Sequence, residues 1–361
     1  MARFSDILEI INGKNQSKVE NPNGMYPIYG SGGIMGYADE YICEPQTVII
    51  GRKGSINKPI FVETPFWNVD TAFGLSANID VLLPKYLFYF CEYFDFEKLN
   101  TTVTIPSLTK ANLLNIEMDL PEIKHQQKIV GQLDQLTNLV SLRKQQLAKL
   151  DELVKARFVE MFGTLENPVQ EFKKATLKDL CNKITDGKHG GCTQEEGTER
   201  YFVGAREIYD DEVHYDTAPE INVAEFEKDY RRCNIEIGDF LIVNTGATIG
   251  KSAIATDSRT EHTLLQKSVA LLKVKNELLN PVFLKWCYRV NTKMYMVESA
   301  SAQPNLLLSK INTTEIYVPD IELQNQFAAF VEQTDKSKSA IQQSLDKLET
   351  LKKALMQKYF G

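Results

Sequence analysis

Cysteine and histidine are scarce in this sequence, and neither is spaced for metal binding or for redox chemistry. The 361 residues include six cysteines without a CxxC pair and four histidines without metal-ligand spacing. Scattered cysteines of this kind are typical of reduced thiols in a cytoplasmic protein. We therefore expect a cytoplasmic location, no bound metal and no cofactor held by this chain. The cysteines are Cys43, Cys91, Cys181, Cys192, Cys233 and Cys287.

Long hydrophobic runs are also absent. No stretch approaches the roughly 20 apolar residues that span a bilayer. The N-terminal segment MARFSDILEIINGK lacks the apolar core of a secretory signal. The sequence therefore predicts a soluble protein without a membrane partner, and its length allows two or three domains.

The sequence has no excess of basic charge. Lysine and arginine number 41 against 48 aspartate and glutamate residues, which gives a formal net charge of −7. Neutralisation of phosphates supplies most non-specific affinity for nucleic acids, so this balance argues against general DNA binding. A DNA-binding role would need local basic surfaces on an acidic protein, or a basic partner.

Motifs of the common enzyme classes are missing. The tetrapeptide of adenine methyltransferases would begin with Asn-Pro, but Asn21-Pro22, Asn167-Pro168 and Asn280-Pro281 have the wrong following residues. The sequence also lacks a glycine-rich cofactor loop, a serine or cysteine triad and a two-metal carboxylate cluster. We therefore do not expect the chain to be an enzyme by itself.

One segment keeps a nucleotide-binding alternative open. GATIGKS, Gly246 to Ser252, resembles part of a phosphate-binding loop. That motif needs a further glycine where this chain has Thr245, and it needs a helix directly afterwards. The following residues, SAIATDSRT, instead favour a strand that ends in a turn.

A long internal repeat is the dominant feature of the sequence. Residues 121–163 align without a gap to residues 319–361, which end the chain. A self-match of this length indicates a duplicated structural unit. The matched pairs include Pro121 with Pro319, Gln126 with Gln324, Leu147 with Leu345, and Phe162-Gly163 with Phe360-Gly361.

Each copy of the repeat predicts one long helix. Hydrophobic residues step by four and three positions, which is the heptad pattern of a helix with one packing seam. About 40 residues at 1.5 Å each give a rod of roughly 60 Å. Neither helix can bury its seam alone, so each is the natural partner of the other; a generic dimerisation helix is the alternative. The seam of the first copy consists of Ile129, Leu133, Leu136, Val140, Leu147, Leu150 and Val154, and Arg143 interrupts it. The seam of the second copy consists of Phe327, Val331, Ile341, Leu345, Leu348 and Leu355, and Thr334, Lys338 and Lys352 interrupt it.

A globular part precedes each long helix, so we expect domains at 1–120, 121–163, 164–318 and 319–361. The two globular parts match well at their C-terminal ends and poorly in their middles, which suggests one scaffold with two recognition surfaces. The expected strands are 47–51, 59–63, 238–244, 251–255 and 268–274; helices are expected from Pro84 and Pro281, and the glycine-rich residues 29–37 are expected to form a loop.

Two loops carry residues suited to DNA. Each is expected to join two strands and to combine small residues with cations, because Arg and Lys reach phosphates or guanine while Asn and Gln can pair with adenine. For any one of these residues, a solvated surface position is the alternative. The candidates in the first part are Tyr29, Ser31, Tyr37, Arg52, Lys53, Ser55, Asn57 and Lys58, and those in the second are Lys188, His189, Asn244, Thr245, Thr248, Lys251, Gln266 and Lys267.

Taken together and in this order, these features resemble the specificity subunit of a type I restriction-modification system over nearly the whole chain. The resemblance rests on YPIYGSGGIMGY followed by TVIIGRKGSINKP and PFWNVDTAF, on GDFLIVNTGATIGKSAI followed by LLQKSVALLK, and on the closing helices. It implies an α+β fold of two repeated α/β target-recognition domains. Each domain is followed by a long helix, and the two helices form an antiparallel coiled coil with pseudo-twofold symmetry.

The resemblance also implies a function and partners. Each domain reads one half of a bipartite, asymmetric site in double-stranded DNA, and the helices fix the gap between the half-sites. The chain docks two DNA methyltransferase subunits, which methylate adenine with S-adenosylmethionine, and restriction subunits can join. The specificity subunit itself is not catalytic. A coiled-coil adaptor that binds only proteins is the alternative from another class, and the acidic composition favours it.

Overall fold

A computed structural model describes residues 1–53, 55–99, 108–296 and 305–361. Pro106 and Pro304, which occupy matching places in the two halves of the sequence, lie outside the described residues. Contacts within the chain group it into two compact units, each of which takes a part of both long helices. The first unit is Met1–Gln146 with Ile341–Gly361, and the second is Leu147–Ala340. The four domains expected from the sequence stay a prediction.

The first unit is built on a four-stranded sheet of order β2-β8-β5-β6, formed by Leu8–Asn12, Ala72–Ala77, Thr47–Gly51 and Ile60–Val62. A second sheet of order β4-β3-β7 contains Gly33–Ala38, Tyr26–Gly30 and Trp67–Asn68. A short ladder pairs β1 (Ala2–Arg3) with β9 (Glu117–Met118). The helices are α1 (Phe4–Ile7), α2 (Pro84–Tyr93), the 3-10 helix η1 (Phe96–Leu99), α3 (Lys110–Leu114) and α4 (Ile123–Phe162).

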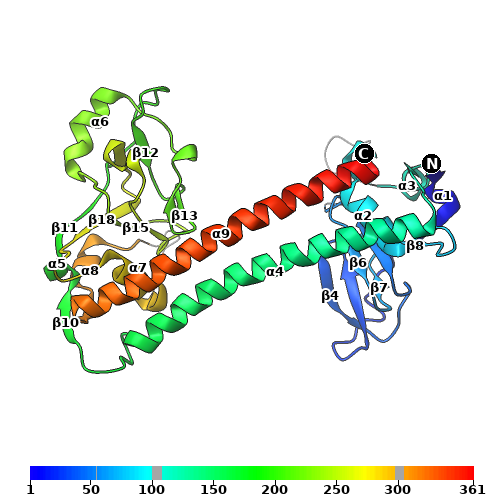
Figure 1. Cartoon of the computed structure of the whole chain (residues 1–361), viewed down its shortest axis with the longest axis horizontal. Helices are drawn as coiled ribbons and strands as arrows, with labels where there is room; N and C mark the ends of the chain where they lie inside the picture. Colours follow the sequence, from blue (N-terminus) through cyan, green and yellow to red (C-terminus); the bar gives the residue numbers. More distant parts are fainter. Residues whose placement is uncertain (54, 100–107, 297–304) are drawn as a thin grey trace. The chain divides into compact units, whose positions relative to one another are not determined.

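The second unit repeats this sheet with the order β11-β18-β15-β16, formed by Cys181–Asp186, Val269–Val274, Phe240–Val243 and Ser252–Ile254 (Figure 1). The smaller ladders are β12 (Tyr201–Val203) with β17 (Thr263–Leu265), β13 (Ile208–Tyr209) with β14 (Glu212–Val213), and β10 (Lys173–Thr176) with β19 (Glu315–Val318). The helices are α5 (Leu177–Leu180), η2 (Tyr215–Thr217), α6 (Val223–Asp229), η3 (Tyr230–Arg232), η4 (Ser258–His262), α7 (Pro281–Val290), η5 (Thr292–Met294), α8 (Leu308–Thr313) and α9 (Ile321–Phe360).

The two units share more than their main sheets. In the first unit β3 pairs with β7 in parallel, and in the second unit β12 pairs with β17 in parallel. The helices α2 and α7 both begin at the expected proline. The duplication predicted from the sequence is therefore present in the topology, and the α+β fold with two repeated domains is confirmed.

One expectation about local structure is wrong. The glycine-rich residues 29–37 do not form an open loop: β3 and β4 form an antiparallel hairpin with Gly30 paired to Gly33. The turn consists of Ser31 and Gly32, and Gly33 has a φ of +119°, which glycine tolerates best. The glycines thus make a tight turn between strands instead of breaking the secondary structure.

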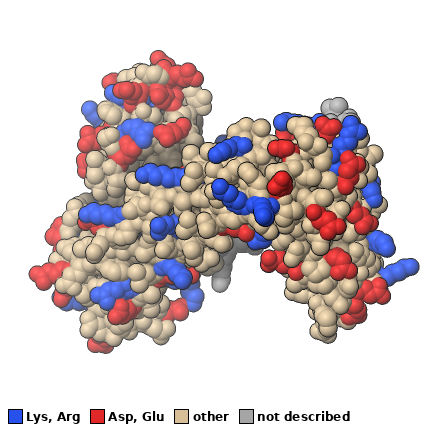
Figure 2. Space-filling model, turned by 45° about the vertical axis from the view of Figure 1, so that its right-hand side comes forward, with Lys and Arg blue, Asp and Glu red and all other residues tan. Residues whose placement is uncertain are grey.

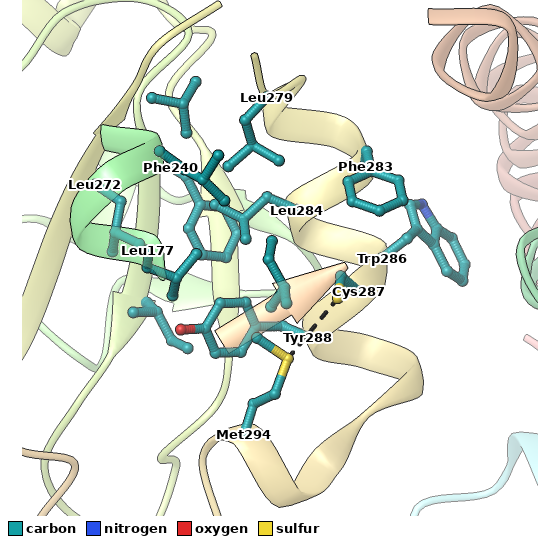
Figure 3. Packing of buried hydrophobic residues seen from close by; sticks show 14 of the residues in the cluster. Leu177, Phe240, Leu272, Leu279, Phe283, Leu284, Trp286, Cys287, Tyr288 and Met294 are labelled. Atoms are coloured by element: carbon teal, nitrogen blue, oxygen red, sulfur yellow. Dashed lines mark hydrogen bonds between the residues drawn. The ribbon is translucent and has the colours of Figure 1, made fainter. Parts of the chain in front are cut away.

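The core of the second unit lies between its main sheet and α7 (Figure 3). Phe240 and Leu272 from the sheet meet Leu284 and Tyr288 from the helix, and all four side chains are buried. The α7 sequence alternates apolar groups at helical spacing, so one face is buried completely. This core fixes the strands whose ends carry the candidate site.

A buried glutamine joins each long helix to its globular part. Gln126 accepts a hydrogen bond from Leu83 N at 2.8 Å and donates to the carbonyl oxygens of Val81 and Pro121, each at 2.8 Å. Its side chain satisfies the backbone just before α2, which is the reason that a polar residue is fully buried here.

The matched Gln324 makes the same three contacts in the second unit. It accepts from Asn280 N at 2.9 Å and donates to the carbonyl oxygens of Leu278 at 3.0 Å and Pro319 at 2.8 Å. The two matched glutamines therefore attach the two long helices to their globular parts through the same hydrogen bonds.

The two long helices run in opposite directions within each unit. In the first unit, Gln132 near the start of α4 contacts Tyr359 near the end of α9, and Lys144 lies 2.8 Å from Glu349. In the second unit, the ring of Phe158 lies 5.3 Å from that of Phe327, near the start of α9. The antiparallel direction implied by the resemblance is therefore observed in each unit.

The polar breaks in the heptad seam have partners of their own. Thr334 is buried and donates to the carbonyl of Phe330 at 2.9 Å. Lys338 pairs with Asp151 on α4. These residues interrupt the apolar pattern without leaving a buried polar group unsatisfied.

Lys352 has two partners in the first unit. It lies 3.0 Å from Glu92 and sits over the ring of Tyr89 at 5.6 Å. This break in the seam therefore ties α9 to α2.

Candidate DNA interface

The hairpin turn and the loop after β5 meet in the first unit. Gly51 ends β5, and a Cβ atom at this position would lie 2.9 Å from Ser31 Cβ and 2.6 Å from the carbonyl oxygen of Ser55. Only glycine permits this close approach. Two of the predicted residues, Ser31 and Ser55, are therefore brought together beside the predicted cations.

The cation-bearing loop is anchored through its backbone. Arg52 N donates to Thr71 O at 2.7 Å, and Leu108 N donates to Arg52 O at 3.0 Å. The Arg52 guanidinium lies 5.7 Å from the centre of the buried Phe73 ring, while the residue as a whole is exposed. Lys53 and Lys58 are also exposed, and the described part of the chain offers none of these three cations a salt bridge.

The remaining predicted residues of the first unit differ in how exposed their side chains are and in the contacts that they already make. Tyr37 is 44% exposed on β4, whereas Tyr29 is half-buried with its ring edge-on to Phe66 at 5.4 Å. Asn57 donates to Asp95 Oδ1 at 2.9 Å and accepts from Phe96 N at 2.8 Å. The Asn57 amide therefore holds the loop in place. Its nitrogen and its oxygen already have partners within the unit, so a contact to adenine would compete with these two hydrogen bonds.

The Gly246–Ser252 segment is a tight connection between β15 and β16. Gly250 N donates to Val243 O at 3.0 Å, and Gly246 and Gly250 have φ angles of +98° and +89°. A strand, β16, follows the segment as expected. Since a phosphate-binding loop must lead into a helix, the geometry does not support nucleotide binding. Lys251 is exposed at the end of this connection, and Thr248 is half-buried within it.

A groove of about 320 Å³ collects three predicted residues of the second unit. Asn244, Thr245 and Lys267 line it together with Asp186 and residues 305–309. Asn244 is buried and its backbone bonds to Ser268 and Leu306, whereas Lys267 is exposed. The groove therefore combines a buried asparagine, held by its backbone, with an exposed lysine.

Lys188, one of the predicted residues, is paired with carboxylates of its own unit. It lies 2.7 Å from Asp229 and 3.3 Å from Glu225, and its side chain is 19% exposed. Hydrogen bonds from Thr193 and from Lys188 lower the pKa of Glu225 to about 2. The charge of Lys188 is thus compensated within the unit. His189 remains 56% exposed and lies 3.5 Å from Asp186.

A second hollow, of about 570 Å³, contains residues that sequence reasoning missed. Gln266, a predicted residue, lines it together with Gln194, Arg206 and Glu207. The sequence GAR, Gly204 to Arg206, could have indicated this hollow. It places an arginine just after strand β12, as Arg52 comes just after strand β5.

Charges of both signs are interspersed on the surface. Figure 2 shows lysine and arginine side chains beside aspartate and glutamate over the face that it draws, and the whole chain has a net charge of −7. The cations of the loops are therefore local features of an acidic protein. No helix of the described residues is long and apolar enough to cross a membrane. The described residues also contain no group of His, Cys, Asp or Glu side chains that could hold a metal ion.

Comparisons with known proteins agree with this architecture. The family profile of the type I restriction modification DNA specificity domain matches residues 1–152 and 169–351. A putative type I specificity subunit N-terminus from Mycoplasma pneumoniae is 28% identical over 139 residues, which cover 37% of this chain and 74% of that protein.

Two solved structures share the fold. The S subunit of a type I restriction-modification system from M. genitalium is similar with a TM-score of 0.63 and 16% identity, over 100% of this chain and 95% of that one. A chain from a structure concerned with complex assembly and conformational transition of the type I R-M system has a TM-score of 0.60 and 16% identity. This likeness covers 99% of this chain and 96% of the other. From the profile match over most of its length, the chain belongs to the family of type I restriction-modification DNA specificity subunits.

Proposed function

We propose that this chain is the non-catalytic subunit that selects the DNA sequence for a type I restriction-modification complex, with one globular part for each half of a bipartite, asymmetric site. The observation that carries the proposal is a repeated sheet order whose strand ends carry different side chains. The shared scaffold would allow both globular parts to bind DNA in the same way, and their different loops would let each part recognise a different half-site. In the first unit the reading surface is the hairpin turn with the Arg52 loop; in the second it is the groove with Lys251 and Lys267.

The long helices supply the second part of the proposal. Each contributes to both units, and 40 residues at about 1.5 Å each span about 60 Å. We infer that they act as the spacer that sets the gap between half-sites, and that they dock two methyltransferase subunits. Those partners would bring S-adenosylmethionine chemistry and part of the contact to the DNA backbone. Restriction subunits would join the same assembly.

Removal of the loop cations tests the proposed reading surfaces. Arg52→Ala and Lys251→Ala, each in the assembled methyltransferase complex, should weaken binding to the cognate duplex. A lost phosphate contact should also reduce the slope of log affinity against log salt by about 1. Lys18→Ala, at an exposed lysine outside these loops, is the matched control. Unchanged affinity and salt slope in both variants would show that the loops are assigned wrongly.

A protein-only adaptor is the second candidate function, because the net charge of −7 disfavours nucleic acid. Filter binding of the assembled complex to cognate and random duplexes separates the two functions. A sequence preference supports the specificity subunit, and equal binding to all duplexes supports the adaptor.

A further inference from the structure

From the second hollow of the second unit, we propose that Arg206 reads a guanine in the half-site of that unit. This inference rests on the proposed function and assigns a base-reading role to a residue outside the loops discussed above. The hollow has a volume of about 570 Å³, and all residues that line it belong to the second unit. Its polar lining includes Gln194, Gln266 and Ser268 beside Arg206 and Glu207.

The hollow lies where two parallel strands end. β12 and β17 run in parallel with Val203 opposite Leu265, so the residues directly after both strands meet at one edge. The turn 204–207 follows β12, and Gln266 to Ser268 follow β17. The carboxyl ends of neighbouring parallel strands commonly form ligand-binding crevices.

Three hydrogen bonds hold the turn that carries Arg206. Gly204 N donates to Glu207 Oε2 at 2.8 Å, and Ala205 N donates to Ser268 Oγ at 3.1 Å. His214 N donates to Glu207 O at 2.8 Å. The Arg206 backbone is therefore preorganised, and this rigidity lowers the entropy that a specific contact would lose.

The Gln266 side chain packs against Gly204. A Cβ atom at this position would lie 2.4 Å from Gln266 Oε1. The Gln266 amide therefore packs directly over the turn, where it can donate and accept beside the guanidinium. Two side chains capable of base recognition are thus placed next to each other.

Arg206 also differs in its charge environment from three other cations of the second unit. Lys188, Arg232 and Arg259 each lie within 3.0 Å of a carboxylate oxygen. Arg206 is exposed, and among the residues that the structure describes none forms a salt bridge with it. Its five donors remain available to an external acceptor.

The neighbouring carboxylate favours a base over a phosphate as that acceptor. Glu207 is 7% exposed and lines the same hollow, so it would repel a phosphate group. In the major groove a G·C pair presents two acceptors on guanine and one amino donor on cytosine. Arginine matches the two acceptors, and a carboxylate matches the donor. The combination of Arg206 with Glu207 therefore favours a G·C pair.

The first unit provides a contrast at the equivalent place. The parallel strands β3 and β7 end beside the hairpin turn Ser31-Gly32, which carries no cation. We therefore expect the first unit to have no counterpart of Arg206 on this turn.

Base analogues test the inference in the assembled methyltransferase complex. The two half-sites are first read from the methylated motif. Each guanine is then replaced in turn by 7-deazaguanine, which lacks the N7 acceptor. With the unaltered chain, one such replacement in the second half-site should weaken binding about tenfold. With Arg206→Met, which keeps an unbranched side chain but removes every hydrogen-bond donor, the same replacement should change affinity less than about twofold. Guanines of the first half-site should respond equally in both complexes.

Lys267→Ala is the matched control, because Lys267 is an exposed cation on the adjacent groove. It should weaken all duplexes alike and retain the 7-deazaguanine penalty. The inference is overturned if the second half-site has no guanine on either strand, if Arg206→Met retains the penalty, or if Arg206→Ala weakens all sequences equally. A complex without any sequence preference is a different result: it overturns the proposed function, and this inference with it.

Discussion

At the scale of single residues, the cluster around Glu225 shows how carboxylates of the second unit compensate a lysine. Thr193 Oγ1 donates to Glu225 at 2.6 Å, and Lys188 lies 3.3 Å away. Both contacts favour the carboxylate, so the pKa of Glu225 falls from 4.5 to about 2. The residue therefore stabilises α6 and the adjoining turn only while it is ionised.

This cluster predicts a dependence of stability on pH. Because the pKa of Glu225 is lower in the folded state, its contribution is present above pH 4.5 and is lost as the pH falls through about 2. Glu225→Gln should lower the free energy of unfolding of the second unit near pH 6, and the difference from wild type should shrink toward pH 2.

Trp286 lies in the second unit, so its fluorescence in a Trp67→Phe background reports the transition in urea. Glu227→Gln, at an exposed position of the same helix, is the control. A difference from wild type that stays constant with pH would contradict the assignment.

The exposure of a residue can be predicted from sequence where its contacts are local, whereas its partners cannot be predicted where they are distant in sequence. The cations of the loop at Arg52 and of the connection ending at Lys251 are exposed beside tight turns, as their sequences indicate. The partners of Lys188, in contrast, come from α6, which is distant in sequence. A single sequence without structure does not show which carboxylate will neutralise a given lysine.

At the scale of elements, strands and helices were predictable because their burial is continuous. β5 occupies residues 47–51 as expected, and the long helices begin two residues after Pro121 and Pro319. Gly163 follows α4 with a φ of +75°, which is the expected left-handed stop. The β3–β4 hairpin was missed because its strands depend on pairing with β7, and glycine-rich segments have little intrinsic strand preference.

The docking of the long helices gives a prediction at this scale. Gln126→Leu should destabilise the first unit by about 1–3 kcal/mol, because the substitution removes the partners of Leu83 N and of two backbone carbonyls. Trp67 fluorescence in a Trp286→Phe background measures unfolding of that unit.

Gln127→Leu, at the exposed neighbouring position, should stay within about 0.5 kcal/mol of wild type. Equal effects of the two substitutions would show that the buried glutamine does not hold the helix to the domain.

At the scale of the whole molecule, the proposed function rests on the repeat. The main sheet order occurs twice, the buried glutamine that docks a long helix occurs twice, and the loops that differ lie at equivalent strand ends. Under the proposal, duplication followed by divergence of the loops would give one chain two different DNA-reading surfaces. The acidic net charge is compatible with this role when partner subunits share the contact to the DNA backbone.

The spacer role leads to a prediction about the recognised motif. One heptad inserted after Leu139 in α4, with a matching heptad between Glu349 and Tyr359 of α9, preserves the seam and lengthens both helices by about 10 Å. The gap between the half-sites should lengthen by up to about three base pairs, since base pairs are spaced by about 3.4 Å.

Methylation-sensitive sequencing of cells that carry the wild-type or the lengthened chain tests this account most directly. We expect the wild-type motif to consist of two unlike half-sites. With the lengthened chain, we expect the same half-sites to be separated by a longer gap. A motif without a gap, or a gap that stays the same after the insertion, would contradict it.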